Sequence, residues 1–498
     1  MATVEPRLYK GLQDYLPDQM AARQRIIDRV RAVCENHGYV PLGTPAMEYL
    51  DVLTGTGGEE ATKQIFSVNT PEEELLGLRF DQTVPLARVV AQYATLPRPF
   101  RRYACSQVWR ADKPEKGRFR EFGQFDFDSV GIDGPAGELA DVEIIALMCD
   151  AMRALEVGPF EVRYSSRAIL GLLLKYAGVP DRLATKRVTR VATADGKEQF
   201  VTEDVWVEGT DVFRVLDKLE KVGLEKVRKE LTTGYKPEPG DPIPGLGLSG
   251  EQVERIERFL AIKDKSRTVV LTKLRGLFEG LEGAAAEIDR VERISKRLYA
   301  IGYGDDCVTL DLSIARGLAY YTGPVFETVL LDAPQYGSVC SGGRYDDLVL
   351  RFHGERLPAV GASIGIDRLL AALTELGRIG LRKSIAQVLV TTMDESLLDE
   401  YLAMTFELRR AGVSTEIFLA KKGFGKQIKH ADTQEIPLSI VCGSDEHARG
   451  VVTIKEMSAG KAISAQITDH AAWKQTRPGQ TEVPRGEMVQ AVKHLLGM

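Results

Sequence analysis

The segment from 108 to 131 constrains the fold more than any other part of the chain. Its second half alternates strictly between polar and aromatic side chains, and this alternation assigns them to two faces. One face carries Gln124, Asp126 and Asp128, and the other carries Phe125 and Phe127. A period of two indicates a β-strand, because successive side chains point to opposite faces of a sheet. We therefore predict two strands around a charged loop.

The loop between the two predicted strands contains Arg110, Arg118 and Arg120. Guanidinium groups beside a polar sheet face are suited to binding an anion and a polar ligand. The same pattern is also typical of a solvated hairpin whose charges keep the protein soluble. The local pattern leaves both interpretations open.

Three further segments each hold one feature of chemical interest. In LDLSIARGLAYYTG (310–323), Arg316 precedes a pair of tyrosines, and in GSVCSGGRYDDLV (337–349) two glycines permit close backbone approach. In VGASIGIDRLLAAL (360–373), Arg368 falls in the first turn of a predicted helix, where the helix dipole disfavours a cation unless an anion is bound. Taken singly, these features also fit structural turns and a surface arginine paired with Asp367.

Composition excludes several classes of protein. A net charge of −6 argues against a uniformly basic nucleic-acid binder. The six cysteines form no C-x-x-C pair, and the six histidines show no H-x-x-x-H spacing, so zinc-ribbon and zincin sites have no support. The N-terminus lacks an apolar signal core, and no apolar run approaches the ~20 residues of a membrane span. We expect a cytoplasmic protein with no membrane partner.

A chain of 498 residues is long enough for two to four domains. Helical patterns cover 18–37, 135–157 and much of 212–300, and strand patterns occur within 78–131 and at 308–314, 323–331 and 360–366. After a linker at 375–386, the pattern is β-α-β-α-β. We predict an α+β catalytic domain on an antiparallel sheet (1–165 and 306–378), a mostly helical insertion (166–305) and a C-terminal α/β domain (386–498).

Taken together, these segments resemble the histidyl-tRNA synthetases. VWRADKPEKGRFREFGQFDFD looks like motif 2 of class II aminoacyl-tRNA synthetases, GASIGIDRLL looks like motif 3, and GYVPLGTPAMEYLD (38–51) looks like the dimer-forming motif 1. LDLSIARGLAYYTG and SGGRYDDLV resemble the two signatures of the histidine enzymes, and LRFDQTVPLAR (78–88) resembles the segment that holds the amino group of histidine. The C-terminal stretch from AKKGFGKQIKHAD onwards is similar to the anticodon-binding domain. The resemblance covers nearly the whole chain and is weakest over 186–245.

This resemblance implies a homodimeric ligase that activates L-histidine with ATP and Mg²⁺ and then charges histidine tRNA. It implies that the catalytic residues are Arg110, Arg316 and Arg368. For ATP it implies an Arg110–Arg368 clamp on the α- and γ-phosphates, with Arg118 assisting at the γ-phosphate. Phe122 would stack on adenine, and Asp112 would hold the adenine region or Mg²⁺.

The resemblance also implies a complete set of histidine-binding residues. Asp81, Thr83 and Gln124 would hold the amino group, and Asp128 and Tyr321 would bind the two imidazole nitrogens. Tyr320 and Tyr345 would close the pocket, and Arg316 would touch both the histidine carboxylate and the α-phosphate.

For tRNA, the resemblance points to Lys113, Glu115 and Lys116 of the motif 2 loop and to Lys421 and Lys426 near the C-terminus. Lysines on a helix are otherwise typical of a solvated face. The sequence departs from the family at three positions. Ala319 replaces the usual Asp, Asp367 replaces Glu in motif 3, and Glu115 occupies a position where many bacterial relatives have Gln.

Two other functions are compatible with a synthetase-like chain. One is a regulatory paralogue in histidine biosynthesis that binds histidine without activating it. The other is a synthetase-like binding module, such as a polymerase accessory subunit. The first generally lacks an anticodon domain and the second lacks the histidine signatures. Because this chain has both features and all three arginines, the enzyme is favoured.

Overall fold

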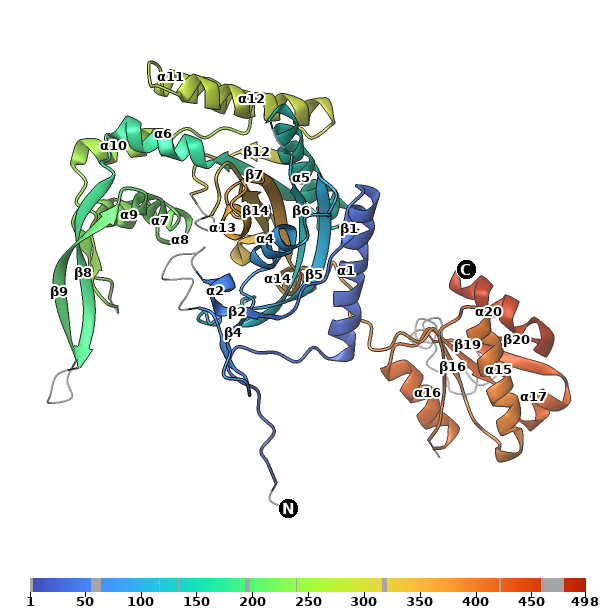
Figure 1. The fold of residues 1–498 in the computed structure, drawn as a ribbon. Helices are drawn as coiled ribbons and strands as arrows, with labels where there is room; N and C mark the ends of the chain where they lie inside the picture. Colours follow the sequence, from blue (N-terminus) through green and yellow to red (C-terminus); the bar gives the residue numbers. More distant parts are fainter. Residues whose placement is uncertain are drawn as a thin grey trace. The chain divides into compact units, whose positions relative to one another are not determined.

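The computed structural model describes residues 3–54, 64–115, 117–132, 134–192, 198–238, 240–315, 320–420, 422–457 and 479–498. The chain divides into two compact units (Figure 1). Unit 1 comprises residues 1–13 and 25–378, and unit 2 comprises residues 14–24 and 379–498. Within the described ranges, no helix has both the length and the hydropathy needed to cross a membrane.

An eight-stranded sheet forms the centre of unit 1, with its strands in the order β1-β5-β6-β15-β14-β13-β7-β12. The interior pairs are antiparallel, whereas the edge pairs β1–β5 and β12–β7 are parallel. The strands are β1 (Val40–Pro41), β5 (Phe100–Trp109), β6 (Glu121–Val130), β7 (Phe160–Ser166), β12 (Val308–Leu310), β13 (Pro324–Leu330), β14 (Ser338–Arg344) and β15 (Ala359–Gly365). The predicted antiparallel core is confirmed, and the edge strands make it a mixed sheet.

The hairpin of β5 and β6 shows how the sequence pattern becomes structure. The two strands pair along their full length, from Phe100 opposite Val130 to Trp109 opposite Glu121. Phe125 and Phe127 are fully buried, and the polar residues of the opposite face are at most 5% exposed. The solvated hairpin is therefore wrong, because both faces of β6 are covered by other parts of unit 1.

Helices of different lengths and a small sheet pack around this core. The sheet is β2-β4-β3, formed by β2 (Met47–Tyr49), β3 (Ser67–Asn69) and β4 (Leu75–Leu78). The helices are α1 (Pro17–Asn36), α2 (Leu50–Leu53), α4 (Thr83–Gln92), α5 (Gly134–Ala154), η1 (Pro334–Tyr336), α13 (Leu350–His353) and α14 (Ile366–Glu375). Helix α1 contributes to unit 1 from residue 25 onwards. Helix α5 packs against β15 and β7, and α14 packs against β6.

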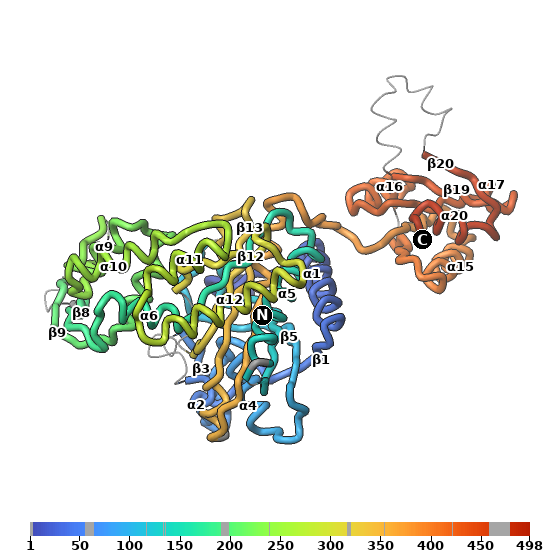
Figure 2. The backbone as a smooth tube through the Cα atoms, turned by 90° about the horizontal axis from the view of Figure 1, so that it is seen from above, coloured from blue at the N-terminus to red at the C-terminus, as the bar shows by residue number. Residues whose placement is uncertain are grey.

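Between β7 and β12 the chain forms a mixed group of helices and short sheets. Its elements are α6 (Arg167–Ala177), β8 (Arg182–Ala192), β9 (Glu198–Glu208), α7 (Asp211–Leu216), α8 (Leu219–Val222), α9 (Leu224–Leu231), β10 (Gly234–Tyr235), β11 (Ile243–Pro244), α10 (Gly250–Leu260), α11 (Arg267–Leu277) and α12 (Ala284–Ala300). Ser249 begins α10 in a capping box with Gln252, which satisfies backbone N–H groups at the helix start. Helices α11 and α12 lie side by side, and α12 also packs on α5 (Figure 2).

Unit 2 is built on a five-stranded sheet in the order β17-β16-β18-β19-β20. Its elements are β16 (Val388–Val390), η2 (Glu395–Leu397), α15 (Leu398–Arg410), β17 (Thr415–Ile417), α16 (Phe424–Thr433), β18 (Leu438–Val441), α17 (Ser444–Ala448), β19 (Val451–Glu456), β20 (Gln480–Pro484), η3 (Arg485–Glu487) and α20 (Met488–Leu496). The first three strands pair in parallel, and β19 and β20 add antiparallel pairs. This is the predicted C-terminal α/β fold, extended by two strands.

Candidate active site

A cavity of about 360 Å³ opens on the sheet of unit 1. Its walls come from the start of α4, the β5–β6 hairpin, β13, β14, β15 and the first turn of α14. Ten residues that the sequence predicted as site residues line it: Asp81, Thr83, Arg110, Asp112, Arg118, Phe122, Gln124, Tyr320, Tyr321 and Arg368. Segments separated by almost three hundred residues therefore meet in one cavity.

Arg110 is held in a fixed orientation beside the cavity. Its guanidinium carbon lies 4.4 Å from the ring centroid of Phe80 and 5.2 Å from that of Phe122. Its Nε donates to the carbonyl oxygen of Phe80 at 3.1 Å, and its Nη2 donates to Oε1 of Gln124 at 3.1 Å. A guanidinium restrained in this way is pre-organised to bind an anion.

Motif 2 and motif 3 meet through Asp367 and Arg368 at the start of α14. The buried Asp367 carboxylate accepts from the backbone N–H of Gly123 in β6 at 2.6 Å. It is therefore not the surface partner that the alternative interpretation assumed. Arg368 donates to the carbonyl of Ser338 at 2.6 Å, and an added Cβ at Gly117 would lie 3.7 Å from its side chain. The motif 2 loop thus lies next to the motif 3 arginine.

Carboxylates and hydroxyls line another part of the cavity. The buried Asp81 accepts from the backbone N–H groups of Thr83 and Val84 at 3.0 and 2.9 Å, which caps the start of α4. Its second oxygen accepts from the Tyr320 hydroxyl at 3.3 Å. Burial raises the pKa of Asp81, and the backbone donors and Arg110 oppose that rise. A carboxylate in this position is suited to an ammonium group.

The Gln124 amide connects the two parts of the cavity. Its oxygen accepts from Arg110, and its nitrogen donates to Ser363 at 2.7 Å and to Asp126 at 3.2 Å. Ser363 also donates to Asp126 at 2.6 Å. These bonds fix which end of the amide faces each neighbour.

Asp128 and Tyr345 do not line the cavity, but Tyr345 packs against Tyr320, which does. The Tyr345 hydroxyl donates to Oδ1 of Asp128 at 2.5 Å, and Nη2 of Arg102 lies 2.9 Å from Oδ2. Burial raises the pKa of Asp128 to about 6, and the Arg102 cation limits that rise. Tyr320 packs on both Tyr321 and Tyr345, with ring centroids 5.1 and 6.0 Å apart.

The remaining predicted residues fall into two groups. Lys113 and Glu115 are exposed on the motif 2 loop, and Lys426 is exposed on α16 of unit 2. Arg316, Lys116 and Lys421 lie outside the described residues, as does the departure at Ala319.

Sequence reasoning missed several polar residues of the site. Ser363 and Glu327 line the cavity, and Arg102 and Asp126 are buried beside it. Asp126 shares the alternating face with Gln124 and was available from the pattern. Arg102 lies opposite Asp128 in the hairpin register, so the register would have identified it.

Comparisons with known proteins identify the family of the chain. A family model described as histidyl-tRNA synthetase matches residues 11–369, and one described as anticodon binding domain matches residues 387–477. The histidine–tRNA ligase of Paracoccus denitrificans is 39% identical, covering 98% of this chain and 97% of the relative. That of Cereibacter sphaeroides is 40% identical with the same coverage of 98% and 97%.

Solved structures show the same fold. The histidyl-tRNA synthetase from Nostoc sp. PCC 7120 superposes with a TM-score of 0.77 at 29% identity, covering 99% of this chain and 100% of that one. A Bacillus halodurans protein titled as an ATP phosphoribosyltransferase regulatory subunit/histidyl-tRNA synthetase shares the fold, with a TM-score of 0.64 at 23% identity and coverage of 86% and 97%. On its family match and its full-length relatives, the chain belongs to the histidyl-tRNA synthetases, the class II aminoacyl-tRNA synthetases that act as histidine–tRNA ligases with ATP as a substrate.

Proposed function

We propose that this chain joins L-histidine to ATP as histidyl-adenylate and then transfers the histidyl group to the 3′ end of histidine tRNA. In the first step a carboxylate oxygen of histidine bonds to the α-phosphorus, and the bond to the pyrophosphate oxygen breaks. In the second step a terminal ribose hydroxyl attacks the acyl carbon, and AMP leaves. The observation that carries the proposal is one cavity with arginines for phosphate and a carboxylate–tyrosine group for an amino acid.

ATP occupies the arginine-lined part of the cavity in this proposal. Arg110 and Arg368 contact the α- and γ-phosphates, Arg118 assists at the γ-phosphate, Phe122 stacks on adenine and Asp112 holds the adenine region. The restrained guanidinium of Arg110 supports its role, because in-line attack on phosphorus depends on positioning and charge neutralisation. A general base is unnecessary, since the attacking carboxylate is already ionised.

Histidine occupies the part of the cavity lined by Asp81 and the tyrosines. Asp81, Thr83 and Gln124 receive the amino group, and Asp128 and Tyr321 bind the imidazole nitrogens, with Tyr320 and Tyr345 closing the pocket. The buried Asp81 and the Tyr345–Asp128 hydrogen bond support these roles. We propose Arg316, on sequence grounds, as the cation between the histidine carboxylate and the α-phosphate.

Mg²⁺ fits the donor set of the cavity. Among the described residues there is no group of three metal-ligating side chains, but Mg²⁺ in nucleotide sites takes one or two carboxylates and completes its shell with phosphates and water. Asp112 and Glu327 supply carboxylates at the cavity wall. Bound there, Mg²⁺ would neutralise phosphate charge.

tRNA binding is assigned to two places. Lys113, Glu115 and Lys116 of the motif 2 loop would contact the acceptor end, and Lys421 and Lys426 would contact phosphates near the anticodon. The exposure of Lys113, Glu115 and Lys426 supports this assignment. The corresponding domain bounds are 1–165 with 306–378 for catalysis, 166–305 for the insertion and 386–498 for the anticodon.

We also propose a homodimer formed through motif 1, in the cytoplasm. Val40, Met47 and Tyr49 of motif 1 are 49%, 49% and 55% exposed. Large apolar side chains that are exposed on a surface favour burial against a partner.

The test is exchange of pyrophosphate into ATP with each of the twenty amino acids. Only L-histidine should support exchange, and a chain that binds histidine without exchange would instead be a regulatory paralogue. Arg316→Ala should lower exchange at least about 100-fold, because a lost cation at a developing charge costs on the order of 3 kcal/mol. Histidine binding by calorimetry should remain measurable. Near-normal exchange in Arg316→Ala would refute the role of that arginine.

A further inference from the structure

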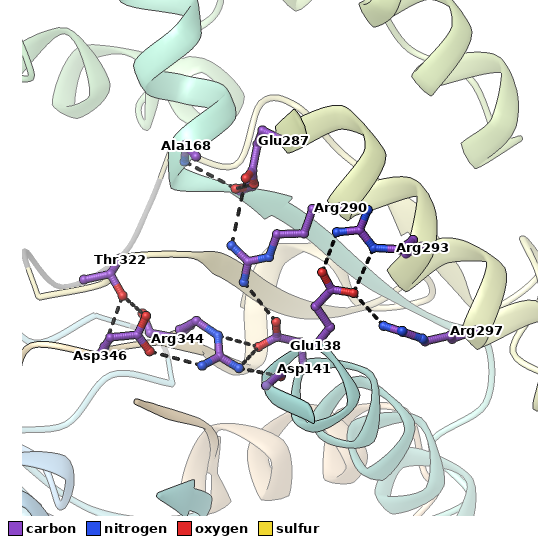
Figure 3. A network of polar contacts seen from close by, with 12 residues as sticks. Glu138, Asp141, Ala168, Glu287, Arg290, Arg293, Arg297, Thr322, Arg344 and Asp346 are labelled. Atoms are coloured by element: carbon purple, nitrogen blue, oxygen red, sulfur yellow. Dashed lines mark hydrogen bonds and ion pairs between the residues drawn. The ribbon is translucent and has the colours of Figure 1, made fainter. Parts of the chain in front are cut away.

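A series of buried ion pairs connects insertion helix α12 to strand β14 of the catalytic sheet (Figure 3). Arg290 of α12 lies 3.2 Å from Oδ2 of Asp141 in α5, and Oδ1 of Asp141 lies 2.7 Å from Nη2 of Arg344 at the end of β14. The Asp141 side chain is completely buried, that of Arg344 is 5% exposed and that of Arg290 is 24% exposed. Ion pairs away from water are screened little, and loss of Arg290 leaves Arg344 as the remaining cation partner of Asp141.

Arg344 is part of the framework of the proposed histidine pocket. Its carbonyl accepts from the backbone N–H of Thr322 at 2.8 Å, and its Nη1 donates to Asp346 at 3.1 Å. The Thr322 hydroxyl in turn accepts from the backbone N–H of Asp346 at 3.1 Å. These bonds fasten the backbone just after Tyr321 to the backbone just after Tyr345. Both tyrosines belong to the proposed pocket.

Close packing beside Arg344 reinforces this connection. A Cβ placed on Gly343 would lie 2.9 Å from the Tyr321 ring, and one placed on Gly323 would lie 2.9 Å from Cδ of Arg344. The Tyr321 ring and the Arg344 stem therefore each occupy the space that a side chain at the neighbouring glycine would need.

A second connection leaves the same face of α12. Glu287 accepts from the Ser166 hydroxyl at 2.5 Å and lies 3.9 Å from Arg290. Ser166 is the N-cap of α6, and the next backbone N–H, that of Arg167, donates to the carbonyl of Gly323 at 3.0 Å. Two separate routes therefore connect the insertion to the residues that directly follow the paired tyrosines. One reaches Thr322 through Arg344. The other reaches Gly323 through Ser166 and Arg167.

We propose that Arg290 of the insertion is a positioning residue for histidine binding, acting through Asp141 and Arg344 on Tyr321 and Tyr345. The proposal rests on the proposed function of the same cavity. Arg290 contacts no substrate, so its effect falls on the affinity for histidine. Three of the proposed ATP residues, Arg110, Arg368 and Phe122, make bonds and packing contacts with residues outside this series.

Helix α12 also provides a matched control. Arg293 lies one turn from Arg290 and pairs with Glu138, 2.6 Å away, which also pairs with Arg297 (Figure 3). Glu138 is on α5, as Asp141 is, but the Arg293–Glu138 pair lies outside the route through Arg344. If these ion pairs only hold α12 on α5, replacing Arg290 and replacing Arg293 should have equal effects on the KM for histidine.

The experiment compares Arg290→Met, Arg290→Lys and Arg293→Met in the full chain by histidine-dependent pyrophosphate exchange. Mutation of residues that couple two parts of a protein changes affinity by factors of a few to tens. Arg290→Met should therefore raise the KM for histidine about 5-fold and leave the KM for ATP within about 2-fold of the wild-type value. Arg290→Lys should recover part of the loss because it keeps the cation, and Arg293→Met should leave both KM values within about 2-fold. Equal effects of the two Met variants, or a parallel rise in both KM values, would overturn the proposal.

A second comparison tests the route itself. Asp141→Asn removes the link between the two arginines, so adding Arg290→Met to it should raise the KM for histidine by much less than Arg290→Met does alone. Additive effects would overturn the route through Asp141. If Asp141→Asn does not fold, the Arg290 and Arg293 variants still decide the proposal. Failure of the proposed function would appear differently, as no histidine-dependent exchange in the wild type.

Discussion

Replacing Arg102 with Met tests whether a buried cation keeps Asp128, the carboxylate that we propose binds imidazole, ionised. The Arg102 side chain is 1% exposed and that of Asp128 is 3% exposed, with 2.9 Å between Nη2 and Oδ2. Burial raises the pKa of Asp128 to about 6, the Arg102 cation opposes the rise, and Asp126 adds to it. Methionine approximates the length of the arginine stem but removes the charge.

The expected change follows from the loss of one member of a buried pair. Such a loss costs about 3 kcal/mol, and because 1.36 kcal/mol corresponds to one pKa unit, the pKa of Asp128 rises by about 2. The charge on Asp128 is present above its pKa and is lost as the pH falls through it. The KM for histidine should therefore rise below about pH 6 in the wild type and below about pH 8 in Arg102→Met.

The assay is histidine-dependent pyrophosphate exchange between pH 5.5 and about 9, with saturating ATP. The imidazole of free histidine also titrates near pH 6.5, but it affects both enzymes equally, so the displacement between the two profiles is diagnostic. The double variant Arg102→Met/Asp128→Asn removes the titrating group and should show no break near pH 8. A break that stays near pH 6 in Arg102→Met would refute the reasoning.

Three further predictions concern the same site and the second unit. Tyr345→Phe removes a hydrogen bond to the Asp128 carboxylate and should raise the KM for histidine about tenfold, measured by exchange, because bonds to charged groups contribute about 1.5–3 kcal/mol; an unchanged KM would contradict it. Gly361→Ala places a Cβ 1.9 Å from Oδ1 of Asp128 and should raise that KM more than the KM for ATP; equal effects on both would contradict the assignment. A chain ending after Gly380 should still exchange pyrophosphate, but its rate of tRNA charging should fall by at least about tenfold as phosphate contacts are lost; intact charging would exclude an anticodon role for residues 386–498.

Local sequence patterns predicted the elements that carry the site, because their side chains alternate or repeat clearly. The period of two at 121–130 identified β6 and the face that carries Gln124. The same period did not predict whether that face is exposed or buried. Alternation shows that the two faces differ in polarity, but it does not show that either face is exposed to solvent. Strand β5 begins at Phe100, well before the segment 108–131 in which the two strands were predicted. A strand that is covered on both sides need not alternate, so the first residues of β5 gave no periodic signal.

The polar connections behind the cavity were beyond sequence analysis for a different reason. Arg102 stands in the run FRRYA, which is as typical of a surface strand as of a buried cation. Arg290 and Asp141 are 149 residues apart in the chain, so no periodicity relates them. Partners of this kind are determined by how the insertion packs on α5, which depends on tertiary structure rather than on local propensity.

Under the proposed function, an excess of buried carboxylates would help one cavity to bind two substrates of opposite character. Asp81, Asp126 and Asp128 are buried within the same group, and the buried cations beside them are Arg102 and Arg79. Uncompensated buried charge is costly, and this cost appears in the raised pKa values of Asp81 and Asp128. A substrate ammonium group would offset part of it, so this part of the cavity favours an amino acid. The parts lined by Arg110, Arg118 and Arg368 instead favour phosphate. Under the proposed function, this electrostatic difference would orient both substrates before any bond is made.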